Sequence, residues 1–101
     1  MANGGVTVGS SAPILSAVHT SRVVSTMLSS GMYEASGSWS RDIGVPAKSG
    51  VSGAIFAVVP GKFGVVSYAP QIDDEGNSVR GMVFFRALVK QLPELSLFAT
   101  S

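Results

Sequence analysis

The sequence contains no cysteine and few charged residues. The first absence excludes disulfide bonds and thiolate metal sites, and it is compatible with a cytoplasmic protein. Charged residues are 13% of the total, although about 25% is usual for a soluble domain. Seven basic and six acidic residues give a net charge of +1. Such a balance argues against a nucleic-acid surface, which needs clustered lysine and arginine.

Membrane and metal signals are also missing. No apolar run approaches the ~20 residues of a membrane helix, and the N-terminus lacks the basic and apolar regions of a signal peptide. His19 is the only histidine, and no acidic or second histidine partner is spaced to form a metal site with it. The acidic run Asp73-Asp74-Glu75 lacks the spacing of a calcium loop and predicts a solvated turn. We therefore expect no metal, no cofactor and no membrane partner.

Apolar residues are in surplus instead. They make up 46% of a chain of 101 residues, which is long enough for one domain or part of one. A small domain has a large surface relative to its volume and should be more polar than average. Either the chain buries its surface in a homo-oligomer, or it is a piece of a larger fold whose other part covers its apolar faces. The composition favours the second interpretation.

The first third of the chain predicts a loop and one helix. Residues 1–11 are rich in glycine and serine and predict the loop. Apolar residues then recur at helical spacing over 13–30. Pro13 suits the first turn, where its missing N–H costs nothing, and Ser10 or Ser11 offers a cap.

A β-hairpin and a second helix are predicted in the remainder. Apolar, β-prone residues over 51–68 are interrupted by Pro60-Gly61, which suits the central positions of a type II turn and predicts an antiparallel pair. Ser78 is the expected cap of a helix over 79–92, whose apolar side chains cover most of its circumference. Helices together with an antiparallel hairpin predict an α+β fold.

One glycine-rich stretch, from Gly44 to Gly53, joins the polar first half to the apolar second half. We expect Lys48 in a loop at the entrance of an inner strand, where its charge would face an anionic substrate group. The alternative is an ordinary surface lysine. Ser49 would hydrogen-bond a carboxylate, or simply end a turn. The backbone N–H of Val51 follows a glycine, and pointing into a site it would serve as half of an oxyanion hole.

Tyr33 stands where the first helix gives way to a loop. One interpretation is a half-buried tyrosine whose hydroxyl bonds a backbone group. The other is a phenol used in proton transfer, which needs a cation nearby, and Lys48 is the candidate. These groups and the Val51 N–H suit acyl transfer but do not complete it. A hydroxyl nucleophile needs an adjacent base, and the sequence has no Ser-x-x-Lys, no Gly-x-Ser-x-Gly and no cysteine–histidine pair.

Several motifs stand in the order known from one family. They are SGMYEASG at 30–37, GVPAKSGVSG at 44–53, VVPGK at 58–62 and GNS at 76–78. With them, the chain resembles the C-terminal part of serine-dependent glutaminases, from about Ala2 to Phe98. These enzymes belong to the β-lactamase and penicillin-binding-protein superfamily. The resemblance implies a fragment of a β-lactamase-like fold, with an N-side helix, an antiparallel hairpin and a C-terminal helix packed on the sheet.

The resemblance also implies an activity and site residues. Such enzymes hydrolyse L-glutamine to L-glutamate and ammonia through an acyl-serine intermediate, and a Ser-x-x-Lys motif supplies the nucleophile and its base. Tyr33 matches the tyrosine that relays protons and touches substrate. Val51 matches the residue whose N–H completes the oxyanion hole. Lys48-Ser49-Gly50 matches the Lys-Thr/Ser-Gly strand motif of the superfamily, so Tyr33 and Lys48 are the expected catalytic residues, and Ser49 and Val51 join Tyr33 in binding substrate.

Because the sequence has no Ser-x-x-Lys motif, we do not expect the chain to be an active enzyme alone. We expect 1–101 to be a single C-terminal segment of a glutaminase-like catalytic domain that does not hydrolyse glutamine alone. Its partners would be L-glutamine and either further copies or the missing N-terminal part of the enzyme. Two alternatives stay open: a non-catalytic, truncated interaction module, and another β-lactamase-like acyl-serine hydrolase. Light scattering tests the first alternative, and a glutaminase assay of the complete enzyme tests the second.

Overall fold

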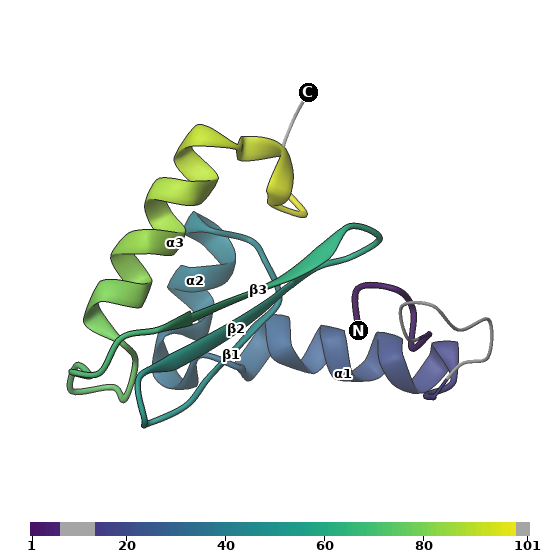
Figure 1. Ribbon diagram of the computed structural model, residues 1–101, viewed down its shortest axis with the longest axis horizontal. Coiled ribbons are helices and arrows are strands. Elements are labelled where there is room, and N and C mark those ends of the chain that lie inside the picture. Colours follow the sequence, from purple (N-terminus) through teal and green to yellow (C-terminus); the bar gives the residue numbers. More distant parts are fainter. Residues whose placement is uncertain (7–13, 99–101) are drawn as a thin grey trace.

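The computed structural model describes residues 1–6 and 14–98. Its three helices are α1 (Ala17–Ser30), α2 (Ser36–Asp42) and α3 (Val79–Gln91), and its strands are β1 (Ala47–Ser49), β2 (Ala54–Val59) and β3 (Phe63–Tyr68). Short 3₁₀ turns cover Tyr33–Ala35 and Pro93–Leu95. The strands form one antiparallel sheet in the order β1-β2-β3, with α2 and α3 on one face of it (Figure 1). The predicted α+β class is confirmed, with its hairpin and its C-terminal helix on the sheet.

Helix α1 begins later than the sequence predicts. Ser16 is its N-cap, and the Ser16 hydroxyl accepts a hydrogen bond from the His19 N–H at 3.1 Å. A helix that starts at Pro13 is therefore wrong, because residues 14–16 are not helical and a nearer serine caps the first turn. The expected caps Ser10 and Ser11, and most of the second half of the predicted loop, lie outside the described residues.

The sheet contains a strand that the sequence does not predict, β1. Lys48 lies within β1, at the edge of the sheet, and not in a loop that leads into an inner strand. Residues 50–53 then turn the chain, and the Gly50 N–H donates to the Ala54 carbonyl at 2.9 Å. The hairpin consequently begins at Ala54 rather than at Val51. A strand as short as β1 has too few residues to show alternation, so the pattern gave no signal for it.

Two local predictions of turn and cap chemistry are confirmed. Gly61 adopts a φ of +75°, as the third residue of a type II turn requires, and the Lys62 N–H donates to the Val59 carbonyl at 3.0 Å. Ser78 caps α3, because its hydroxyl accepts from the Gly81 N–H at 3.0 Å.

The core lies between the sheet and helices α2 and α3. Trp39 of α2 is buried and donates from Nε1 to the Val45 carbonyl at 2.7 Å. Its ring meets Phe85 of α3 edge to face, with centroids 5.4 Å apart. The same cluster includes Met32, Ile55, Ala57 and Leu95. This packing fixes the sheet relative to α2, and therefore relative to the turn that carries Tyr33.

Apolar side chains also remain exposed. On the sheet face away from α2 and α3, Phe56 pairs in register with Lys48 and Val66, and Tyr68 is exposed beyond them. Helix α3 exposes Phe84 as well. Among the described helices, none combines the length and the apolar character needed to cross a bilayer.

The aromatic pair in the core supports a stability prediction. We expect Phe85→Ala to lower the free energy of unfolding of the chain by about 3–5 kcal/mol, because Phe85 is 1% exposed and its removal leaves a cavity beside Trp39. Phe84→Ala is the matched control. Phe84 is 45% exposed, so we expect its substitution to lower the free energy of unfolding by only about 1 kcal/mol. Urea unfolding followed by circular dichroism measures both. Equal losses in the two variants would contradict this description of the core.

Candidate functional site

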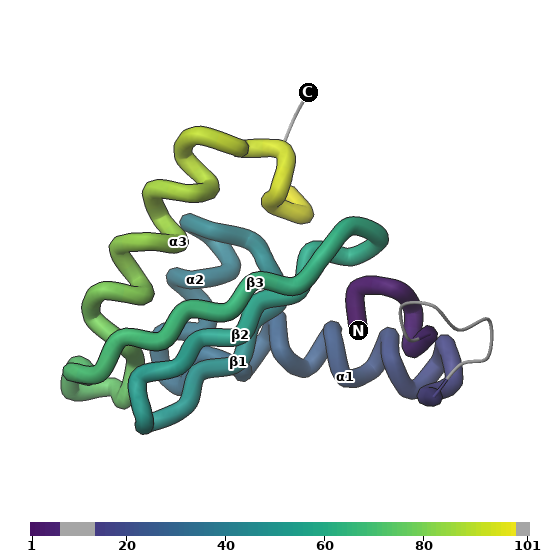
Figure 2. Tube along the Cα trace, viewed as in Figure 1, coloured from purple at the N-terminus to yellow at the C-terminus, as the bar shows by residue number. Residues whose placement is uncertain are grey.

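Three segments that are far apart in the sequence meet at one end of the sheet. They are the turn at Tyr33, the 50–53 turn and the loop over 73–77; the last two lie together at the left-hand end of the sheet in Figure 2. A methyl group built on Gly76 would lie 3.4 Å from Cε2 of Tyr33 and 3.7 Å from Cγ1 of Val51. The structure therefore brings Tyr33 and Val51 to the same small region, with Gly76 between them.

Tyr33 is held in an unusual backbone conformation. Its φ is +56°, in the left-handed region that bulky residues rarely occupy, and this costs about 1–3 kcal/mol. The side chain is 40% exposed. No hydrogen bond to the Tyr33 hydroxyl is found from any described residue, so the interpretation of a tyrosine anchored to a backbone group has no support in the described chain. Among residues 1–6 and 14–98, none occupies the position of a hydrogen-bond partner to this phenol.

Lys48 lies directly beside this ring. Its Nζ is 4.6 Å from the ring centroid of Tyr33, within cation–π range, and it also donates to the Ser49 carbonyl. Lys48 borders a cavity of about 350 Å³ whose opposite wall comes from α1, including Arg22, Thr26 and Ser30. The sequence-predicted pair of a phenol and a cation is thus in contact.

Val51 carries a backbone donor that the described fold leaves unpaired. The residue is 69% exposed, and within residues 1–6 and 14–98 its N–H has no hydrogen-bond acceptor, whereas the neighbouring Gly50 and Gly53 N–H groups are both paired. The N–H of Val51 lies in the turn that immediately follows β1. An unpaired donor in this position can bind an anionic oxygen.

Ser49 is placed differently from Lys48. Alternation along β1 turns the Ser49 side chain to the face that packs on the helices, where it is buried. Its hydroxyl has no hydrogen-bond partner among the described residues. The expected contact between Ser49 and a carboxylate stays a prediction, and the structure does not bring this hydroxyl to Tyr33.

Two residues that support Tyr33 were not predicted as part of the site. Ser36 lies in the first turn of α2, and its hydroxyl accepts from the Met32 N–H at 3.0 Å and donates to the Tyr33 carbonyl at 2.7 Å. Asn77 donates from Nδ2 to the Met32 carbonyl at 3.1 Å. The available signal was the GNS motif at 76–78, but the sequence does not indicate that its asparagine reaches the turn before Tyr33.

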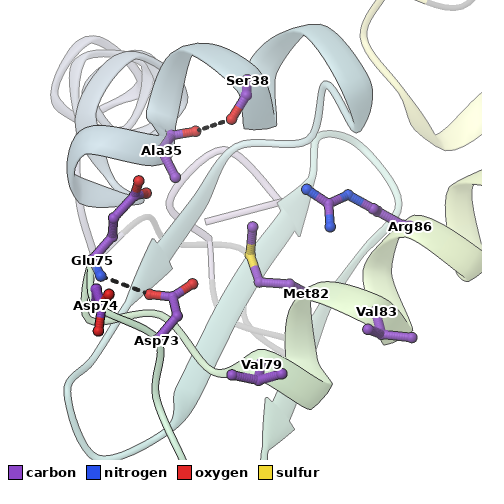
Figure 3. Close-up of a pocket in the computed structure, with 9 residues that line it drawn as sticks. All are labelled: Ala35, Ser38, Asp73, Asp74, Glu75, Val79, Met82, Val83 and Arg86. Atoms are coloured by element: carbon purple, nitrogen blue, oxygen red, sulfur yellow. Dashed lines mark hydrogen bonds between the residues drawn. The ribbon is translucent and has the colours of Figure 1, made fainter.

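A second cavity lies beside the acidic loop and contains none of the predicted site residues. It measures about 480 Å³ and lies between Asp74, Glu75 and the side chains of α3, with Arg86 on its far wall (Figure 3). The Asp73 carboxylate points back toward its own loop, where it accepts a hydrogen bond from the Glu75 N–H at 2.9 Å (Figure 3). Across residues 1–6 and 14–98, no group of three histidine, aspartate or glutamate side chains is arranged so that it could hold a metal ion.

An exposed ion pair lies at the end of α2. Arg41 Nε donates to Asp42 Oδ1 at 3.0 Å, and this hydrogen bond lowers the pKa of the Asp42 carboxyl and raises the pKa of Arg41. The pair stabilises the fold at neutral pH, and that contribution is lost as the pH falls through the lowered pKa of Asp42. Both side chains are exposed, so water screens the pair and its contribution is small.

The sequence of the chain is similar to that of known proteins. A family model described as Glutaminase matches residues 1–98. Glutaminase 1 of Bradyrhizobium diazoefficiens is 47% identical over 88 residues, which make up 87% of this chain and 14% of that protein. A glutaminase of Escherichia coli O81 is 41% identical over 92 residues, or 91% of this chain and 30% of that protein. The chain thus spans less than a third of either relative.

Solved structures agree with the sequence relatives. The crystal structure of Mglu in its glutamate form superposes with a TM-score of 0.89 at 40% identity, over 99% of this chain and 23% of that one. A Bacillus glutaminase crystallised in 4.3 M NaCl superposes with a TM-score of 0.89 at 37% identity, over 96% of this chain and 34% of that one. The similarity covers nearly the whole chain in both cases.

Proposed function

Because the chain belongs to the glutaminase family, we propose that the complete protein hydrolyses L-glutamine to L-glutamate and ammonia through an acyl-serine intermediate. In this proposal the chain supplies one wall of the active site, made of Tyr33, Lys48 and Val51. The observation that carries it is the contact of Lys48 Nζ with the Tyr33 ring at 4.6 Å, with the unpaired Val51 N–H on the adjoining turn. The glutamate form of one solved relative supports the choice of substrate.

The reaction has two halves. A serine hydroxyl from another segment attacks the side-chain amide carbon of glutamine, the C–N bond breaks, and ammonia leaves with the proton that the hydroxyl gave up. Water then attacks the resulting ester, and glutamate is released with its new carboxylate. A Ser-x-x-Lys motif outside these 101 residues would supply the serine and its base, since the sequence itself contains no such motif.

Each residue of the wall has a distinct part in this scheme. The Tyr33 phenol passes the proton between the serine and the departing nitrogen, as a positioned acid–base group does. The ammonium of Lys48 places positive charge beside that ring and faces the negative charge that develops on the reacting groups. The N–H of Val51 donates to the oxygen of the tetrahedral intermediate and is one of the two donors of an oxyanion hole.

The direct test uses the complete enzyme that carries this segment. Release of glutamate and ammonia from L-glutamine, with no turnover of a β-lactam, would support the glutaminase assignment against another acyl-serine hydrolase of the same superfamily. Turnover of the β-lactam without hydrolysis of glutamine would contradict it.

The oxyanion role of Val51 can be tested through its backbone. Val51→Pro removes the N–H, which the described fold does not use, and is expected to lower kcat/KM of the complete enzyme by about 10²–10³-fold. Val51→Ala is the matched control, because it keeps the N–H and removes only an exposed side chain. The oxyanion role is wrong if the proline variant folds, as judged by circular dichroism, and works as well as the alanine variant.

We place the complete enzyme in the cytoplasm, where glutamine is available. Either a second copy or the rest of the polypeptide would cover the open sheet face around Phe56, Val66 and Tyr68. A chain that served only as an interaction module would use the same apolar face, and the absence of self-association in light scattering would argue against that alternative.

A further inference from the structure

We propose that Asn77 is a positioning residue that sets the direction of the Tyr33 phenol, a role that rests on the proposed function of Tyr33. Asn77 is fully buried, and its Nδ2 donates to the Met32 carbonyl at 3.1 Å. The two residues are 45 positions apart in the sequence. Asn77 therefore ties the loop before α3 to the peptide group that leads into Tyr33.

The effect on Tyr33 follows from the geometry of the backbone. The Met32 carbonyl belongs to the peptide plane whose nitrogen is that of Tyr33. Rotation about φ of Tyr33 changes the angle between this plane and the tyrosine side chain. A hydrogen bond that holds the carbonyl in place therefore holds φ at its unusual value of +56°, and with it the direction of the ring.

Hydrogen bonds from Ser36 also hold the turn at Tyr33, but they do not replace the bond from Asn77. The Ser36 hydroxyl accepts from the Met32 N–H and donates to the Tyr33 carbonyl, so it closes the turn from within. Both of these bonds span three or four residues and would move together with the turn. The bond from Asn77 joins the turn to a separate part of the fold, and so it fixes where the turn lies relative to the sheet.

Asn77 is itself firmly held. The Asp73 carboxylate accepts from the Asn77 N–H at 3.0 Å, and the Asp73 N–H donates to the Asn77 carbonyl at 2.8 Å. The loop also approaches the ring, because a methyl group on Gly76 would lie 3.4 Å from Cε2 of Tyr33. One loop thus bonds the backbone before Tyr33 and lies near the edge of its ring, while Lys48 lies over the ring face.

The amide oxygen of Asn77 indicates that the residue does more than fill space in the core. Its Oδ1 is buried and has no hydrogen-bond partner among the described residues, which costs free energy. An apolar side chain of the same size would avoid this cost. Such a side chain would, however, lack the donor to the Met32 carbonyl. This hydrogen bond is what Asn77 contributes to the position of Tyr33.

The test uses the complete enzyme and two substitutions at this position. Asn77→Ala and Asn77→Leu both remove the donor, and the leucine variant keeps the volume in case the alanine variant does not fold. Each is expected to lower kcat about 10–100-fold with KM changed by less than about threefold, because misplacement of a catalytic group slows the chemical step. Ser78→Ala is the matched control, since it removes a neighbouring buried cap of α3 without touching Met32, and its kcat should stay unchanged.

A double variant separates positioning from a general structural role. If Asn77 acts through Tyr33, the variant with both Tyr33→Phe and Asn77→Leu is no slower than Tyr33→Phe alone. Suppose that Tyr33→Phe is slow, as expected. The positioning role is then wrong if the two losses in kcat multiply in the double variant, or if Asn77→Leu alone keeps the wild-type kcat. Wild-type turnover by Tyr33→Phe would instead overturn the proton relay, and the positioning role with it.

Discussion

Replacement of Tyr33 by phenylalanine in the complete enzyme is expected to lower turnover by about 10²–10⁴-fold, the usual scale of acid–base catalysis. The substitution removes only the hydroxyl. The ring remains beside Lys48 and Gly76, and the Met32 carbonyl remains bonded to Asn77. Since no described residue bonds the Tyr33 hydroxyl, its loss leaves no unpaired group in the fold. We therefore expect the loss in kcat to be much larger than any change in glutamine binding.

The second tyrosine of the chain provides the control for this experiment. Tyr68 lies on β3 and is 67% exposed, so Tyr68→Phe removes a hydroxyl of the same chemistry from a different place. Glutamate release at several glutamine concentrations gives kcat and KM for both variants. The relay role requires a slow Tyr33→Phe and a normal Tyr68→Phe. Unchanged turnover in Tyr33→Phe would rule it out.

The features that sequence predicts well are those that a few neighbouring residues determine. Pro60-Gly61 produces the hairpin turn, because proline presets one φ and glycine allows the positive φ of +75°. Ser78 caps α3 through its own hydroxyl. The same local chemistry explains the late start of α1, since Ser16 is an equally good cap that lies closer to the helix than the serines that were predicted.

The features that sequence does not predict depend on contacts between distant segments. Strand β1 exists because Lys48 and its neighbours pair with β2, and three residues carry no periodicity of their own. The left-handed conformation of Tyr33 is unfavourable locally and persists because Ser36 and Asn77 hold the peptide groups around it. The sequence is enough to name Lys48 as a candidate cation. Its position over the Tyr33 ring depends on β1, which the sequence does not predict.

One face of the sheet carries exposed apolar side chains, as the composition of the chain leads one to expect. The surplus of apolar residues predicts faces that something else covers, and the structure leaves Phe56, Val66 and Tyr68 exposed on one sheet face. The relatives extend well beyond the matched region, since the chain covers 14% of one and 30% of another. In the proposed enzyme, the polypeptide that supplies the serine nucleophile would also cover this face, which is the face that carries Lys48.

Purified chain 1–101 is therefore expected to show no glutaminase activity. Of the described residues, Ser30 and Ser49 lie close to Lys48, and neither has the setting of a nucleophile. The Ser30 hydroxyl borders the same cavity but donates to the Thr26 carbonyl at 2.9 Å. The Ser49 hydroxyl is buried on the other face of β1. An acyl-enzyme needs a hydroxyl held against a base, and neither the Ser30 nor the Ser49 hydroxyl is held in this way beside Tyr33 and Lys48.

The measurement compares glutamate release by the chain with release by the complete enzyme at equal molar concentration. The expected rate for the chain equals that of a glutamine blank. In the proposed mechanism Tyr33, Lys48 and Val51 stabilise charge and move a proton, but they do not form the ester through which the amide is cleaved. The chain must be shown to be folded, and the fluorescence of Trp39 in the core reports this. Glutamate release above the blank would mean that a hydroxyl within these residues is the nucleophile, and Ser30→Ala and Ser49→Ala would then identify it.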